Sequence, residues 1–134
     1  MTTYTALIVD DEPDIRELLE ITLTRMGITT LTAPDLTSAR KLLEQNTTHL
    51  CLTDMNLPDG NGIELVQWIQ KHSPATPVAV ITAYGNMDTA IESLKAGAFD
   101  FVSKPVELPR LRELVNSALK LAEPKADTED TADE

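Results

Sequence analysis

The sequence predicts an α/β fold in which a five-stranded parallel sheet is covered by helices on both faces. Five short apolar segments alternate along the chain with five segments of helical periodicity, as expected for repeated strand–helix units. The apolar segments lack the in–out alternation of strands with one face in water, which indicates burial on both sides. The length of 134 residues and the 42% hydrophobic content fit one globular domain with a real core.

The first two strand–helix units occupy the N-terminal part of the chain. The apolar run TALIVD (5–10) predicts the first strand, and Pro13 follows at a position that a first helical turn accepts. The helix ends at Gly27, and its core-facing residues recur at helical spacing: Ile15, Leu18, Leu19, Thr22 and Met26. ITTLTA (28–33) predicts the second strand, and Asp35 caps the helix after it. The apolar stripe of that helix is Leu36, Ala39, Leu42 and Leu43.

The third and fourth units follow the same plan. HLCLTD (49–54) predicts a buried strand that ends at Asp54, and the breakers Pro58, Asp59 and Gly60 then form a turn. The next helix has its apolar stripe at Ile63, Leu65, Val66 and Ile69. PVAVIT (77–82) predicts the fourth strand, and a helix runs from about Met87 to Ala96.

The fifth unit completes the folded part of the chain. FDFVS (99–103) predicts the last strand, and Pro109 lies in the first turn of the last helix. The apolar positions of this helix are Leu108, Leu111, Leu114, Val115, Ala118 and Leu119. The folded domain therefore covers residues 4–122. Residues 123–134, with six acidic residues, one lysine and no apolar periodicity, are predicted to be a disordered linker or tail.

Composition excludes several classes of function. The formal net charge of −11 argues against nucleic-acid binding by this segment. No stretch approaches the roughly 20 apolar residues of a membrane span, and the N-terminus lacks the layout of a signal peptide. We therefore expect no membrane contact and a cytoplasmic location. The lone Cys51 cannot form an internal disulfide and is expected to be a buried structural thiol.

Polar residues gather where four of the five strands end. The first strand ends in Asp10-Asp11-Glu12, the third in Asp54, the fourth in Thr82 and the fifth in Ser103-Lys104-Pro105. Taken singly, each has a structural explanation: a helix cap, a turn aspartate, a strand-forming threonine or a surface lysine. Together they fall at the edge where open parallel sheets bind ligands, which favours a functional site.

This residue set suits phosphoryl chemistry. Carboxylates about 4 Å apart repel by on the order of 1–4 kcal/mol, and a hard divalent cation such as Mg²⁺ relieves that repulsion. One carboxylate can then act as a nucleophile toward a phosphoryl group. The lysine ammonium, the threonine hydroxyl and backbone N–H groups can share the charge of the transferred group.

Four motifs, LIVDDEPDIRELL, LTDMNLPDGNG, VITAYG and VSKPV, resemble the receiver domain of two-component response regulators. The resemblance covers residues 4–122 and implies the flavodoxin-like strand order 2-1-3-4-5. It also implies that Asp54 is the phospho-acceptor and that Mg²⁺ is the only cofactor. The implied metal ligands are Asp10, Asp11, Asp54 and the backbone carbonyl of Asn56.

The same resemblance implies roles for the remaining strand-end residues. Thr82 would hydrogen-bond the phosphoryl group, Lys104 would pair with it, and Pro105 would follow a cis peptide bond. Phe101 matches the aromatic switch position. On phosphorylation its side chain would follow Thr82 inward, and segment 84–94 would move. Gly85 would act as a hinge or simply as a helix-entry turn. Asn56 and Tyr84 would tune how fast the phosphoryl group is lost.

The segment ITAYGNMDTAIESLKAGAFDFVSKPV is most similar to NtrC-type receivers, which serve sigma-54-dependent activators, and among them to regulators of pilus genes. A sensor histidine kinase is the implied phosphoryl donor, and the face around Ile15, Leu18 and Leu19 is the implied docking surface. A homodimer through the fourth helix, fifth strand and fifth helix is also implied. The output ATPase and DNA-binding domains are expected outside this chain, because it has no GxxxxGK[ST] loop and no basic recognition helix.

Several alternatives remain open at this level. The chain could be a stand-alone receiver, an aspartate-nucleophile Mg²⁺ phosphatase or a flavodoxin-like FMN carrier. A degenerate receiver that only binds partners is contradicted by the intact set of acidic residues, threonine and lysine. The phosphatase normally carries a second aspartate two positions after its nucleophile. In this chain Glu12 stands two positions after Asp10, and Asn56 stands two positions after Asp54. The flavin carrier needs hydroxyl-rich phosphate loops and flanking aromatics, and aromatics are 4% of this chain. We expect a signalling domain without multiple turnover.

Overall fold

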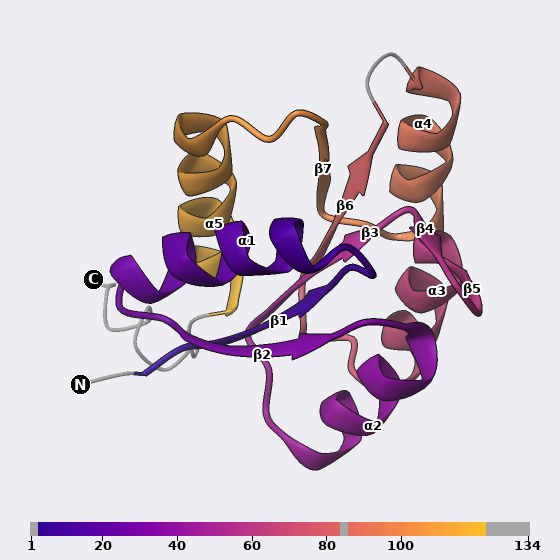
Figure 1. The fold of residues 1–134 in the computed structure, drawn as a ribbon. Coiled ribbons are helices and arrows are strands. Elements are labelled where there is room, and N and C mark those ends of the chain that lie inside the picture. Colours follow the sequence, from indigo (N-terminus) through magenta and orange to yellow (C-terminus); the bar gives the residue numbers. More distant parts are fainter. Residues whose placement is uncertain (1–2, 84–85, 123–134) are drawn as a thin grey trace, which may run out of the picture.

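The computed structural model, which describes residues 3–83 and 86–122, has a parallel five-stranded sheet between two layers of helices (Figure 1). The strand order is β2-β1-β3-β6-β7, which is the order 2-1-3-4-5 when only the sheet strands are counted. The strands are β1 (Thr5–Val9), β2 (Thr29–Ala33), β3 (Leu50–Asp54), β6 (Val78–Thr82) and β7 (Asp100–Ser103). Neighbouring strands pair in parallel throughout, so the predicted fold class and strand order are confirmed.

Local sequence signals explain where the helices begin and end. The helices are α1 (Pro13–Arg25), α2 (Leu36–Gln45), α3 (Gly62–His72), α4 (Met87–Ala96) and α5 (Leu108–Ala122). The caps Asp35, Asn61 and Asn86 each accept a hydrogen bond from a backbone N–H in the first turn of their helix, which satisfies a donor that has no partner within the helix. Gly97 ends α4 with a φ of 119°, a conformation that favours glycine.

The sheet separates two hydrophobic clusters. Because side chains alternate along a strand, Leu7 and Val9 of β1 pack with α2 and α3, whereas Ala6 and Ile8 pack with α1 and α5. Figure 1 shows α1 and α5 on one face of the sheet and α2, α3 and α4 on the other. Cys51 is buried in the first cluster, as expected.

The first helix departs from the predicted stripe at one position. Leu18 is 37% exposed, and Leu23 takes the core position with no exposed surface. The reason is angular: residues advance about 100° around a helix, so Leu18 lies a quarter turn away from Leu19, whereas Leu23 lies one turn along the same face. Leu19 itself is fully buried, so it cannot belong to a docking surface on α1.

The turn after β3 contains an element that sequence analysis missed. Strands β4 (Asn56–Leu57) and β5 (Gly60–Asn61) form a small antiparallel hairpin around the predicted breakers Pro58 and Asp59. Tyr84, Gly85 and the acidic segment 123–134 lie outside the described residues, so the predictions for them stay predictions. Within residues 3–83 and 86–122, none of the helices combines the length and the apolar character that crossing a membrane requires.

The two clusters predict additive effects of core mutations. Leu65→Ala on α3 and Leu114→Ala on α5 each empty a fully buried site, and each is expected to cost about 2–5 kcal/mol of unfolding free energy. Because the sites lie in different clusters, the double mutant should lose the sum to within about 0.5 kcal/mol. Urea denaturation of the four proteins measures this, and a markedly smaller combined loss would contradict two separate cores.

Candidate functional site

The ends of the parallel strands bring the predicted polar residues to one edge of the sheet. Asp10 directly follows β1, Asp54 is the last residue of β3, and Thr82 ends β6. Thr82 pairs in register with Ser103, which places Lys104 just beyond the edge. Asp10, Asp54 and Thr82 have 0%, 6% and 1% of their surface exposed, so the sheet holds two carboxylates and a hydroxyl largely out of water.

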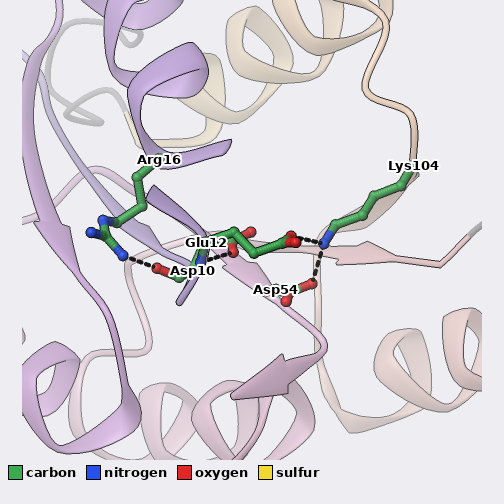
Figure 2. Close-up of polar contacts among 5 residues, drawn as sticks. All are labelled: Asp10, Glu12, Arg16, Asp54 and Lys104. Atoms are coloured by element: carbon green, nitrogen blue, oxygen red, sulfur yellow. Dashed lines mark hydrogen bonds and ion pairs between the residues drawn. The ribbon is translucent and has the colours of Figure 1, made fainter. Parts of the chain in front are cut away.

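Lys104 places a positive charge beside the carboxylates of this edge. Its Nζ lies 3.2 Å from Oδ1 of Asp54 and 3.1 Å from Oε1 of Glu12 (Figure 2). Partial burial lowers the pKa of Lys104, but the hydrogen bond to Glu12 and the charge of Asp54 outweigh it, so the pKa lies above its ordinary value. The Lys104–Pro105 bond is cis, as the resemblance implied, and the backbone N–H of Lys104 donates to the Thr82 carbonyl at 2.8 Å.

Within the described part of the chain, one carboxylate oxygen of Asp10 accepts a hydrogen bond and the other does not. Its Oδ1 accepts from the Glu12 backbone N–H at 2.9 Å, and its backbone carbonyl accepts from Nη1 of Arg16 at 2.7 Å (Figure 2). Its Oδ2 is buried and has no hydrogen-bond partner within the described part of the chain. Burial raises the pKa of Asp10 from 3.8 to about 6, and the nearby charge of Asp54 adds to this rise.

The carboxylates fit a hard divalent cation. One oxygen each from Asp10, Asp11 and Asp54 lies within 4.8 Å of the others, and Asp11 is exposed at the rim. Such oxygen ligands on an open rim, which leaves room for water, suit Mg²⁺. The unpartnered Oδ2 of Asp10 independently indicates a missing partner for this carboxylate. Asn56 lies two residues beyond Asp54 in β4, and its role as a carbonyl ligand stays a prediction.

Asp54 is fixed by its own chain as well as by Lys104. Its pKa is raised by burial and held down in part by the charge and hydrogen bond of Lys104. The next backbone N–H, that of Met55, donates to the Ile81 carbonyl at 2.9 Å, and Gly62 donates back to the Met55 carbonyl at 2.8 Å. A Cβ on Gly62 would lie 2.7 Å from the Asp54 carbonyl oxygen, so this close approach requires glycine. Gly62 was not among the predicted site residues, although the short spacing of two glycines in DGNG was a visible signal.

Phe101 lies in β7, in register with Val80 of β6. It is partly buried and lines a pocket of about 460 Å³ together with Val102, Ser103, Lys104, Pro105, Glu107 and Arg110. Arg110 of α5, which sequence analysis did not single out, donates from Nη2 to the Phe101 carbonyl at 2.9 Å and to Asp100 at 3.1 Å. The β7 backbone at the predicted switch residue is therefore tied to α5.

Comparison with known proteins agrees with this geometry. The response regulator receiver domain family matches residues 6–116. Response regulator protein PilR of Pseudomonas aeruginosa is 63% identical over 127 residues, which make up 95% of this chain and 28% of PilR. The receiver domain of NtrX from Brucella abortus has a TM-score of 0.82 at 36% identity, covering 86% of this chain and 98% of that one. The beryllofluoride-activated NtrC4 receiver domain dimer has a TM-score of 0.84 at 32% identity, covering 89% and 98%.

The family match spans every strand-end residue from Asp10 to Lys104. The predicted similarity to NtrC-type receivers, and within them to pilus-gene regulators, is confirmed. The chain spans little more than a quarter of the length of PilR.

The raised pKa of Asp10 predicts how the metal-free protein responds to pH. A carboxyl group whose pKa is higher when folded binds its proton more tightly in the fold, so its contribution to stability is present at low pH and is lost as pH rises from about 4 to 6. A shift from 3.8 to about 6 corresponds to roughly 3 kcal/mol as an upper limit. Asp10→Asn removes this loss, so in EDTA the mutant should gain stability relative to wild type between about pH 4 and 7.

Urea denaturation at a series of pH values measures this difference, and Asp14→Asn serves as an exposed control on the same loop–helix segment. A stability difference between Asp10→Asn and wild type that stayed constant across this range would show that the pKa of Asp10 is not raised in the folded protein.

Proposed function

Because this chain belongs to the response regulator receiver domain family, we propose that it takes a phosphoryl group from a sensor histidine kinase onto Asp54 and passes a conformational change to an output domain. The observation that carries the proposal is the buried Asp54 carboxylate, 3.2 Å from the Lys104 ammonium and within an acidic cluster that fits a cation. The family match favours this function over the phosphatase and flavin-carrier alternatives.

The phosphoryl transfer assigns one task to each residue. An oxygen of Asp54 forms a bond to phosphorus as the bond from phosphorus to the donor's imidazole nitrogen breaks, and the imidazole leaves with the electron pair and is protonated. Asp54 must be ionised to attack, and Lys104 favours that form. Once the phosphoryl group is on Asp54, Lys104 and the Thr82 hydroxyl neutralise its oxygens. Mg²⁺, held by Asp10, Asp11, Asp54 and the Asn56 carbonyl, would supply positive charge against both the carboxylates and the phosphoryl oxygens.

The signal leaves the site through β6 and β7. Thr82 pairs in register with Ser103, and the Lys104 N–H bonds to the Thr82 carbonyl, so a movement of Thr82 acts directly on the segment that carries Phe101. Phe101 borders an open pocket beside β7 and α5. In this proposal Thr82 moves toward the phosphoryl group and Phe101 follows, which reshapes the surface formed by α4, β7 and α5.

The surface of α4 supplies a face for a second copy of the chain. Met87, Ile91 and Leu94 recur at helical spacing and are 55%, 46% and 40% exposed. The similar NtrC4 receiver domain forms a dimer when activated by beryllofluoride. We therefore retain the homodimer through α4, β7 and α5 as part of the proposal.

The remaining partners follow from the family and from the exposed residues of α1. Leu18 and Ile21 are 37% and 44% exposed and Ile15 is partly buried beside them, so this face, without Leu19, forms the proposed kinase-docking surface. Since the chain covers 28% of PilR, we place the output ATPase and DNA-binding domains of a sigma-54-dependent activator beyond residue 122 of the whole protein. The proposed location is cytoplasmic, and the domain itself binds no nucleic acid and turns over no substrate repeatedly.

Phosphorylation can be tested by intact-protein mass. Incubation with acetyl phosphate and Mg²⁺ should add a single phosphoryl group to wild type and none to Asp54→Asn. Lys104→Ala should still bind Mg²⁺, but its yield of phosphorylated protein should fall by about tenfold or more. Asp35→Asn, which lies on the α2 cap, should behave as wild type. An adduct that persists in Asp54→Asn, or that forms equally well in EDTA, would contradict the mechanism.

The dimer face can be tested by sedimentation in beryllofluoride and Mg²⁺. Wild type should dimerise, and Ile91→Glu should weaken the dimer by at least about tenfold, because it places a charge in a desolvated apolar contact. Ile21→Glu is a matched control. Ile21 of α1 is 44% exposed and Ile91 of α4 is 46% exposed, so the two substitutions differ mainly in the helix that carries them. Equal effects of the two substitutions, or a wild type that stays monomeric, would remove α4 from the proposed interface.

A further inference from the structure

The Asp59 carboxylate ties the β4–β5 hairpin to the beginning of α2. Its Oδ1 accepts from the Leu36 backbone N–H at 2.8 Å, and its Oδ2 accepts from the Thr37 N–H at 3.1 Å and the Thr37 Oγ1 at 2.9 Å. Leu36 and Thr37 are the first residues of α2, where backbone N–H groups have no partner within the helix. The hydrogen bond from Leu36 is the main reason that the pKa of Asp59 lies below its ordinary value.

This contact is not the ordinary cap of α2. The helix already has a local cap, because Asp35 accepts from the Ser38 N–H at 2.8 Å. Asp59 comes from a segment 22 and 23 residues further along the chain, so its bonds join two separate elements. The element that gains a fixed position is therefore the hairpin, because α2 is capped without it.

The hairpin needs such an anchor. It has two residues on each strand, with Asn56 paired to Asn61 and Leu57 to Gly60, and so small a hairpin is not stable by itself. Its inner end is fixed by the bonds from Met55 to Ile81 and from Gly62 to Met55. Its outer end is fixed by Asp59, and Gly60 packs so closely on Leu36 that a Cβ would collide with that side chain. Asn56 lies between these two anchors.

We propose that Asp59 is a positioning residue of the phosphorylation site: by anchoring the hairpin to α2, it holds the backbone carbonyl of Asn56 where that oxygen completes the cation site of Asp10, Asp11 and Asp54. The inference rests on the function proposed above. It predicts that loss of the anchor weakens Mg²⁺ binding, while the attacking carboxylate and Lys104 stay in place. Phosphorylation should then be slow at low Mg²⁺ and recover at saturating Mg²⁺.

The experiment compares Asp59→Ala with Asp35→Ala, which removes the local cap from the same helix end but leaves the hairpin anchored. Mg²⁺ affinity is measured by calorimetry, and the rate of adduct formation with acetyl phosphate is measured across Mg²⁺ concentrations. Asp59→Ala should weaken Mg²⁺ binding by about tenfold, the lower end of the effect of groups that orient metal ligands. Asp35→Ala should stay within about twofold of wild type. Asp59→Asn, which keeps one oxygen acceptor toward Leu36, should recover part of the affinity.

A second readout needs no metal. In EDTA, hydrogen exchange at the hairpin amides should accelerate in Asp59→Ala and not in Asp35→Ala, while exchange in β1 and β3 stays slow in both and shows that the fold is intact. Equal Mg²⁺ affinity and equal hairpin exchange in the two alanine variants would overturn the positioning role. A wild type that forms no Mg²⁺-dependent adduct would overturn the proposed function and this inference with it, which separates that failure from a failure of Asp59 alone.

Discussion

The like charge of Asp10 and Asp54, held together at one edge of the sheet, is the constraint around which the rest of the site is arranged. Two buried carboxylates this close repel each other by on the order of 1–4 kcal/mol. They are therefore not stable as two anions without a compensating positive charge. Lys104 supplies one positive charge, but it is shared between Asp54 and Glu12. The described site therefore carries an excess of negative charge, which a bound cation would relieve.

A fold can hold such a cluster only if its scaffold does not yield to the repulsion. Asp10 and Asp54 are continuations of adjacent central strands whose backbones are hydrogen-bonded in register. Beyond the sheet, the loop after Asp54 closes through Met55, Ile81 and Gly62, and its far end reaches α2 through Asp59. The repulsion between the two carboxylates therefore contributes to the raised pKa of Asp10, and burial raises the pKa of both groups.

The fold and most of the site were predictable from sequence because both follow from local patterns. Strand and helix periodicity located the elements, and the rule that parallel strands end at one edge brought Asp10, Asp54, Thr82 and Lys104 together. Contacts between segments distant in the chain were not predictable: Glu12 with Lys104, Asp59 with α2, and Arg110 with Phe101. Each depends on side-chain geometry in three dimensions, and the same residue types are common in solvated turns and helix faces.

The division of the interior into two clusters has a consequence for how such domains diverge. Among the described residues no side chain belongs to both clusters, because strand side chains alternate between the two faces of the sheet. Mutations that accumulate under α1 and α5 can therefore be accommodated by their own neighbours, without forcing changes beneath α2 and α3.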